Sequence, residues 1–538
     1  MVQLTGKPEV KGSTESMRMA LLTFSLVGLQ FTWGIEMTYC TPYLLQLGLT
    51  KSRTSLVWIA GPISGLIMQP IVGVVADSSQ SKYGRRRPFM VGGSVLVALC
   101  LVVMGWAKEI VGCFVEEGER RNTLTIVLAV FSIYAVDFAI NAVQACCRSL
   151  IVDTLPIPKQ QAGSAWASRM VSIGHLVGYM VGTVDLVKVF GTAFGDTQFK
   201  KLTLVAGFAI ISAVSVTCWA VTERVLVSSG KDEEKPGPVQ IVQRIFKSTM
   251  ELPPRIQAIC WVQFWSWIGW FPFLFYSTTW VGETYFRYDA PNEIRDTKDA
   301  LGEIGRIGSM SLVVFSFVHF TGAFILPQLI KSPEQKSFTA RPPAAFAELV
   351  TVFQKYKPDL LTAWMCGHLM FSSAMIFAPF AHSVRFATTL VAMCGLPWSV
   401  LIWAPNAFMG IEVNRLSSSP AQHRRLPTTT PIELSPTTPY TPSLCAPLGD
   451  DTSSNGELAG LYFGILNIYN TLPQFIGTFI SMIVFSILEP GKSPELSDAH
   501  PSEHHAADGP NAISVCLFIG AISSVGAAYA TKRLKDIL

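Results

Sequence analysis

Charged residues are scarce in this chain. Only 14% of its 538 residues are Asp, Glu, Lys or Arg, and half are hydrophobic, whereas a soluble protein of this length carries about 25% charged residues. The formal net charge of +4 is small and dispersed, which argues against a nucleic-acid-binding protein. The composition therefore predicts a membrane protein whose main partner is the lipid bilayer.

Several motifs that mark other classes of protein are missing. The 11 cysteines include no CxxC pair, so we expect reduced thiols and neither disulfides nor a metal site. The absence of a GxxxxGK[ST] loop argues against an ATP-driven pump, and no nucleophile stands with a base at motif spacing. We therefore expect no enzyme activity. The polar N-terminus is followed by an apolar run too long for a cleavable signal peptide.

What the chain does contain is a series of apolar windows, each long enough to cross a bilayer. They divide into six and six around a polar segment, which predicts an all-α membrane protein with twelve transmembrane helices in two six-helix bundles. The windows are 20–44, 55–76, 89–107, 123–145, 165–187, 202–222, 257–280, 307–330, 359–380, 386–411, 458–487 and 512–530.

The windows and the polar segments between them predict the organisation of the chain. Basic residues gather in alternate loops, and the positive-inside rule then places both termini in the cytoplasm. The predicted parts are a cytoplasmic tail 1–19, an N-terminal bundle 20–222, a central cytoplasmic loop 223–256, a C-terminal bundle 257–530 and a cytoplasmic tail 531–538.

A second linker interrupts the C-terminal bundle. Residues 415–457 are dense in Ser, Thr and Pro, so we expect a disordered cytoplasmic segment. Its Ser-Pro and Thr-Pro sites suit modification by a kinase. A passive tether is the alternative interpretation.

The segment GVVADSSQSKYGRRRP joins the second and third windows. In it, Gly73 allows close helix packing, Asp77 lies near a helix end, and Gly84 precedes Arg85 and Arg86. Guanidinium groups there can pair with carboxylates of neighbouring helices, so we expect a conformational latch. Alternatively, the arginines only anchor the loop in the cytoplasm. The segment resembles the G-x-x-x-D-(x)-G-R-(R) signature of the major facilitator superfamily, which implies that superfamily's fold.

One predicted helix carries a polar stripe. The stretch AVDFAINAVQACCRSLIVD places Asp137, Asn141, Gln144 and Arg148 near one line, because eleven residues return almost to the same angular position. An ionisable side chain at mid-bilayer costs at least about 2.5 kcal/mol, which indicates a use. Three uses are open: a structural ion pair, a polyol site without a proton, and a coupled site. We favour the third, in which Asp137 takes a proton and Arg148 responds to the change of charge.

Longer motifs give a family resemblance over nearly the whole chain. The chain resembles the sucrose/α-glucoside:proton symporters, in the glycoside–pentoside–hexuronide:cation symporter group of the major facilitator superfamily. The motifs include GLQFTWGIEMTYCTPYLLQLGL (28–49), VDFAINAVQACCRSLIVD (136–153), WVQFWSWIGWFPFLFYSTTWVGE (261–283) and LYFGILNIYNTLPQFI (461–476).

The resemblance implies roles for particular residues. Asp137 matches the family's membrane-buried proton-coupling aspartate, and Arg148 matches an arginine implicated in sugar binding, whose guanidinium group suits paired hydroxyls. The proton is then the coupling ion, and no other cofactor is expected. Further candidates for substrate binding are Gln30, Trp33, Glu36, Asn141, Gln144 and Gln263.

The chain also departs from the plant members of this family. Ser277 and Thr279 stand where aspartates are expected, and Glu283 stands in an arginine position. A histidine of the first outer loop is absent, and TKSR (50–53) occupies its place. These departures indicate a fungal-type member and weaken any transfer of plant substrate preference.

The sequence thus predicts a multi-pass membrane protein that imports sucrose- or maltose-type α-glucosides with a proton, by alternating access. We expect it in the plasma membrane, with a vacuolar membrane as the alternative. Two other functions stay open: a proton-independent sugar facilitator, and a sugar-sensing transceptor whose 415–457 linker recruits partners.

Overall fold

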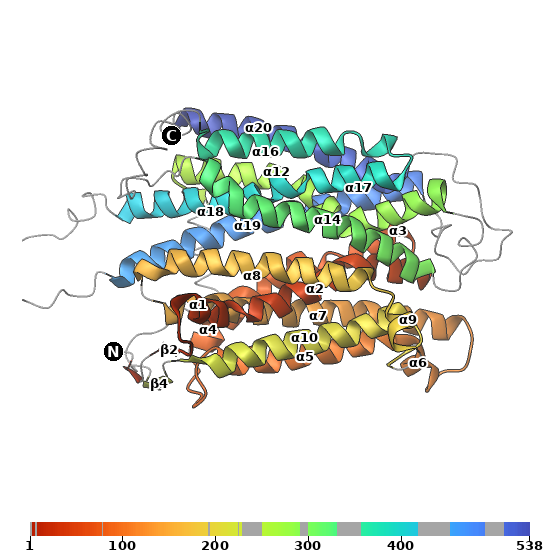
Figure 1. The fold of residues 1–538 in the computed structure, drawn as a ribbon, viewed down its shortest axis with the longest axis horizontal. Coiled ribbons are helices and arrows are strands. Elements are labelled where there is room, and N and C mark those ends of the chain that lie inside the picture. The colour runs from red at the N-terminus through yellow and green to blue at the C-terminus, as the bar shows by residue number, and fades with distance from the viewer. Residues whose placement is uncertain are drawn as a thin grey trace, which may run out of the picture.

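Two helical bundles lie side by side, and both chain ends lie at one end of the molecule (Figure 1). We call this the tail end. We call the opposite end the loop end. It carries the short helices α3 (Lys51–Val57), α6 (Ala107–Gly112) and α9 (Leu186–Phe190). The structure is a computed structural model. It describes residues 3–5, 8–77, 79–155, 157–191, 194–223, 225–228, 250–290, 300–330, 357–417, 452–489 and 511–537.

The described part of the N-terminal bundle contains six long helical spans, the first of which is broken into two helices. α1 (Glu15–Thr23) and α2 (Ser25–Gln46) meet at a bend of 41°. The Thr14 hydroxyl caps α1 by accepting the Met17 amide hydrogen. The remaining helices are α4 (Ala60–Asp77), α5 (Arg87–Gly105), α7 (Glu119–Thr154), α8 (Ile157–Thr183) and α10 (Gln198–Ala220).

The C-terminal bundle repeats this arrangement. Its first helix passes into a π-helical turn, and its fourth span is broken into two helices. The elements are α12 (Pro254–Thr284), η1 (Tyr285–Asp289), α14 (Ala300–Leu329), α16 (Leu360–Met375), η3 (Ala378–Phe380), α17 (Val384–Met393), α18 (Gly395–Ser417), α19 (Thr452–Leu488) and α20 (Ala512–Ile537).

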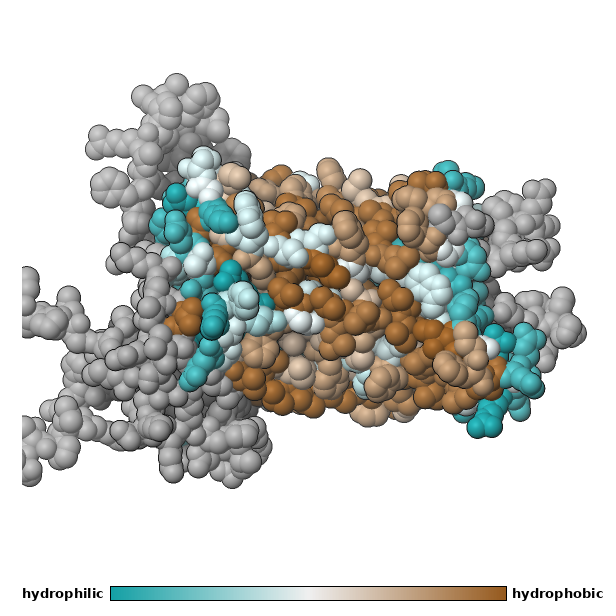
Figure 2. Space-filling view, turned by 90° about the horizontal axis from the view of Figure 1, so that it is seen from below, coloured by the Kyte–Doolittle hydropathy of each residue, from teal (hydrophilic) through white to brown (hydrophobic). Residues whose placement is uncertain are grey.

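The helices match a membrane environment. Among the described residues, nine helices are long and apolar enough to span a bilayer, and α1 with α2 gives a tenth. α4 and α8 occupy the other two predicted windows. Figure 2 shows one face of the molecule, on which apolar residues predominate across the middle and hydrophilic residues gather at both ends. The protein is therefore an all-α, multi-pass membrane protein.

The structure moves several predicted boundaries. Helices extend past the apolar windows, most of all α7, because polar turns at a helix end can stand outside the hydrocarbon layer. The predicted disordered linker 415–457 is too long, since its ends belong to α18 and α19. Its residues 418–451 lie outside the described part of the chain.

The N-terminal tail is paired to the chain that follows α10, which the sequence did not predict. β1 (Gln3–Thr5) pairs antiparallel with β4 (Val225–Ser228), and β2 (Glu9–Val10) pairs with β3 (Val221–Thr222). These short ladders attach the predicted tail 1–19 to the start of the predicted central loop 223–256.

Glycines on α8 bring the two bundles together. A Cβ at Gly174 would lie 2.6 Å from the Val27 carbonyl oxygen of α2, and one at Gly182 would lie 2.5 Å from the Ser309 hydroxyl of α14. Small residues permit this close backbone approach. α8 is therefore packed on its own bundle through one part of its surface and on the other bundle through another.

Candidate substrate and proton site

The polar stripe lies on α7, and its residues occupy different environments. Asp137, Asn141 and Gln144 are buried, each about 4% exposed, whereas Arg148 is exposed. Eleven residues of helix separate Asp137 from Arg148 by about 16 Å along the axis, so the two side chains do not form an ion pair. The stripe therefore runs from a closed interior to an accessible guanidinium group.

Asp137 is buried without a full set of partners. Its Oδ2 atom has no hydrogen-bond partner in the described part of the chain. An ionised carboxylate buried without a cation costs several kcal/mol, so the position suits a carboxyl group that carries a proton. This favours the coupled site over a structural ion pair between Asp137 and Arg148.

Asn141 begins a chain of amides that crosses between the bundles. Its Nδ2 group donates to the Ser64 hydroxyl and to the Asp137 carbonyl oxygen, both at 2.9 Å. Gln69 of α4 donates to the Asn141 Oδ1 at 3.4 Å, and Asn467 of α19 donates to the Gln69 Oε1 at 3.5 Å. The last two bonds are long. These amide groups can therefore give up their hydrogen bonds to one another and form hydrogen bonds to sugar hydroxyls instead.

Sequence reasoning missed three members of this chain, namely Ser64, Gln69 and Asn467. The signal was present, because Gln69 and Asn467 are amides inside apolar windows. However, Asn467 and Gln69 belong to different bundles, and their contact depends on how the bundles pack.

The other predicted substrate residues are spread over α2 and α12. Gln30 is buried where α2 meets Gly174 of α8, and Trp33 is half-buried. Gln263 is 1% exposed, and its Oε1 has no partner within the described residues. Glu36 is buried, and neither of its carboxyl oxygens has a hydrogen-bond partner in the part of the chain that the structure describes. The structure records no hydrogen bond from any of these four side chains to Asp137 or Arg148 among the residues it describes.

A buried charge cluster, which we call the Lys51 cluster, closes the loop end between the bundles. The Lys51 ammonium group of α3 lies 2.7 Å from a carboxylate oxygen of Glu283 on α12 and also contacts Glu489 after α19. Arg287 approaches Glu489 at 3.2 Å, and Asn511 donates to Glu283 at 2.7 Å. Lys51 is only 3% exposed and Glu283 is fully buried.

Three more contacts reinforce this closure. The Thr41 hydroxyl of α2 donates to the Phe275 carbonyl oxygen of α12 at 3.2 Å, and the ring centres of Trp58 and Phe275 lie 4.4 Å apart with the rings tilted by 43°. Asp185, which precedes α9, pairs with Arg306 of α14 at 2.5 Å. Burial opposes the negative charge of Asp185, but hydrogen bonds from Lys188 and the charge of Arg306 hold the pKa of its carboxyl group below the ordinary value.

The predicted latch residues make contacts within the N-terminal bundle. Arg85 and Arg86 each lie 3.1 Å from the Asp153 carboxylate at the end of α7. Glu223, after α10, accepts the backbone amides of Arg85 and Arg86 at 2.8 Å. Gly84 has a φ of +107° and leaves no room for a Cβ beside Glu223.

These contacts tie the loop before α5 to the ends of α7 and α10. The surroundings of Gly73 and the side chain of Asp77 lie outside the described part of the molecule. Whether the cluster latches a conformation stays a prediction.

Comparisons with known proteins agree with this architecture. The sequence model of the MFS/sugar transport protein family matches residues 23–289. The general alpha-glucoside permease of Schizosaccharomyces pombe is 30% identical, over 98% of this chain and 94% of that protein. The sucrose transport protein SUC4 of Arabidopsis thaliana is 29% identical over 56% of this chain and 62% of its own length.

Solved structures give the fold. A bacterial homologue of the human lysosomal transporter Spinster, in an inward-facing and occupied conformation, has a TM-score of 0.55 at 13% identity and covers 98% of both chains. A D-xylose–proton symporter has a TM-score of 0.54 at 12% identity, over 96% of this chain and 97% of its own.

Proposed function

This chain belongs to the MFS/sugar transport protein family, and we propose that it imports sucrose- or maltose-type α-glucosides together with a proton, by alternating access. The observation that carries the proposal is the pair of environments on α7: a buried carboxyl group at Asp137, whose Oδ2 atom has no hydrogen-bond partner among the described residues, and an exposed guanidinium group at Arg148. One helix thus offers a proton site and a sugar site. The proton is the coupling ion, and no other cofactor takes part.

The proposed cycle uses residues of both bundles. Asp137 takes a proton, and the sugar binds between the bundles, where Arg148 and the amide chain of Asn141, Gln69 and Asn467 donate to its hydroxyls. The bundles then rock about their shared contacts. In the described conformation the Lys51 cluster closes the loop end. Opening that end requires its cross-bundle ion pairs to separate.

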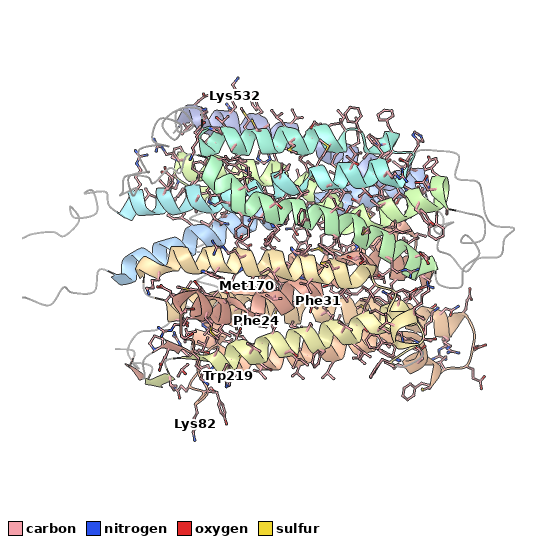
Figure 3. The ribbon with its side chains drawn as sticks, viewed as in Figure 1. Phe24, Phe31, Lys82, Met170, Trp219 and Lys532 are labelled. Carbon is pink, nitrogen blue, oxygen red and sulfur yellow. The ribbon has the colours of Figure 1, made fainter. Side chains whose placement is uncertain are left out.

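The orientation follows from the charges. Lys82 and Lys532 project from the tail end of the two bundles (Figure 3), and the Arg85–Arg86 pair lies in the loop that follows α4. The tail end therefore faces the cytoplasm under the positive-inside rule, and the loop end faces outward.

The membrane is the plasma membrane, where import from outside would serve the cell. A kinase that modifies the 415–457 linker is a further proposed partner.

The test is uptake of labelled sucrose and maltose by transport-deficient yeast at about pH 5 and about pH 7.5. Acid-stimulated uptake that Asp137→Asn abolishes, while sugar binding persists, supports the proposal. Glu412→Gln is the control, because Glu412 is a buried carboxyl group that already has a partner, Arg255, at 3.2 Å.

Other results would support the alternatives. Uptake that responds neither to pH nor to Asp137→Asn makes the protein a facilitator. Sugar binding without accumulation makes it a sensor of the transceptor kind.

A further inference from the structure

Glu36 is a buried acid that the proposed cycle does not use. It lies in the middle of α2, is 3% exposed, and neither carboxyl oxygen has a hydrogen-bond partner among the described residues. One turn further along α2, the Cys40 sulfur lies 3.8 Å from the Met104 sulfur of α5. This part of α2 therefore faces the interior of the N-terminal bundle. A sugar between the two bundles would not reach it.

The charged neighbour of Glu36 is Asp137. α7 packs against α2, and the charge on the Asp137 carboxyl group acts on Glu36. Cys40 lies within electrostatic reach of both acids. The two carboxyl groups therefore share one buried region, and each has at least one oxygen atom that no described donor satisfies.

The titratable groups closest to this region are a cysteine and two tyrosines, none of which can carry a positive charge, and a histidine lies behind one of the tyrosines. They are Cys40 on α2, Tyr134 on α7 and, on α8, Tyr179, which packs against Gly34. His175 stacks on Tyr179 with ring centres 5.7 Å apart. Within the described part of the chain, the structure records no ion pair between a lysine or arginine and either carboxyl group.

Two carboxylates cannot both be charged in such a place. Burial without a cation disfavours one ionised carboxylate, and a second negative charge close by disfavours it further. At least one proton is therefore held between these residues when the interior is closed.

We propose that Glu36 and Asp137 form a two-carboxyl proton site, in which Glu36 binds a proton and does not bind sugar. This rests on the proposed function and deepens it. A proton from water forms an O–H bond on one carboxylate when the site is open to one side. The same bond breaks on release, and the proton passes to water on the other side.

A direct test follows the protonated carboxyl groups rather than transport. Purified protein in lipid nanodiscs is titrated with base while the carbonyl stretching bands of protonated carboxyl groups are recorded by infrared difference spectroscopy. We expect wild type to lose two buried-carboxyl bands. Glu36→Gln should remove one, Asp137→Asn the other, and Glu412→Gln neither. A band pattern that Glu36→Gln leaves unchanged would overturn the proposal.

Measurements of uptake kinetics distinguish a role of Glu36 in binding the proton from a role in binding sugar. In Glu36→Gln the second negative charge is gone, so the pH midpoint of uptake should move to lower pH by about one unit. The Michaelis constant for sugar at saturating proton concentration should stay within about twofold. Glu36→Asp should restore the midpoint towards wild type. A raised Michaelis constant with an unmoved midpoint would make Glu36 a sugar ligand and contradict the proposal.

The outcome of the infrared measurement does not depend on whether the protein transports sugar. If the wild-type protein shows no proton-coupled uptake, the proposed function fails, whereas two bands that respond to the two variants would still establish the carboxyl pair. If Glu36→Gln does not fold, the reciprocal variant Asp137→Asn carries the same test, because Glu36 must then give the one remaining band.

Discussion

The ammonium group of Lys51 and the carboxylate of Glu283 lie 2.7 Å apart across the boundary between the two bundles. Both side chains are buried, at 3% and 0% exposure. A buried ion pair stabilises a conformation mainly because either charge alone would be costly there. This contact therefore opposes separation of the bundles at the loop end. Removing either charge by substitution should destabilise the conformation described above.

Replacing Lys51 tests this relationship. Lys51→Met leaves the Glu283 and Glu489 carboxylates without the ammonium group, so we expect a loss of about 3–5 kcal/mol of stability. The melting temperature of purified protein measures it. Lys188→Met is the control, because Lys188 is 83% exposed and its pair with Asp185 is worth at most about 1 kcal/mol. Equal shifts in the two variants would refute a stabilising role for the cluster.

A cross-link should hold the loop end closed. The hydroxyl groups of Ser52 and Ser486 lie 2.7 Å apart across the two bundles, a spacing that suits a disulfide after Ser→Cys substitution at both positions. Oxidation of the double variant should abolish uptake, and a reducing agent should restore it, because transport needs this end to open. Each single variant should transport under both conditions. Full uptake by the oxidised, cross-linked protein would show that this contact does not have to break.

The pH dependence of the cluster differs from that of the proposed proton site. Burial opposes the charge on Glu489, but Lys51, the Ala512 amide and Arg287 together hold the pKa of this carboxyl group below its ordinary value. A lowered pKa contributes stability above the ordinary value of about 4.3, and this contribution is lost as pH falls through the folded pKa.

Between about pH 5 and about pH 7.5 Glu489 therefore stays charged. Glu489→Gln should lower the melting temperature throughout that range without moving the pH midpoint of uptake. A moved midpoint would assign part of the proton coupling to Glu489.

Arg148 should act through its forked guanidinium group. Arg148→Lys keeps the positive charge but loses the paired donors that match adjacent hydroxyls. Charge-assisted hydrogen bonds contribute about 1.5–3 kcal/mol, so we expect the Michaelis constant for sugar to rise about 10- to 100-fold. The variant should still fold, because the substitution keeps the positive charge and the Arg148 side chain is accessible. Arg533→Lys at the tail end is the control. Unchanged kinetics in Arg148→Lys would remove Arg148 from the sugar site.

Much of the fold was predictable because a bilayer constrains sequence locally. All twelve predicted windows fall on helices, and the stripe from Asp137 to Arg148 lies on one continuous helix, α7. The errors lie at boundaries. The sequence overestimated the linker at 415–457 and missed the pairing of β1 with β4, which joins segments more than 200 residues apart.

The candidate site was predictable only in part. Asp137 and Asn141 are buried polar residues, as a functional stripe requires. Arg148, however, faces an accessible space, and nothing in the helical spacing separates it from the buried members. Gln69 and Asn467 meet because α4 and α19 come together, which residue periodicity does not encode.

By itself, the sequence determined that this protein spans a membrane, which segments cross it, and which helix carries charge into it. Those properties depend on hydrophobicity and helical period, and both act over neighbouring residues. Only the tertiary structure decided that Lys51 meets Glu283, 232 positions away, and that Glu36 shares a buried region with Asp137. Such contacts depend on how the helices pack, because a buried charge is stabilised or destabilised by the groups that the fold places beside it.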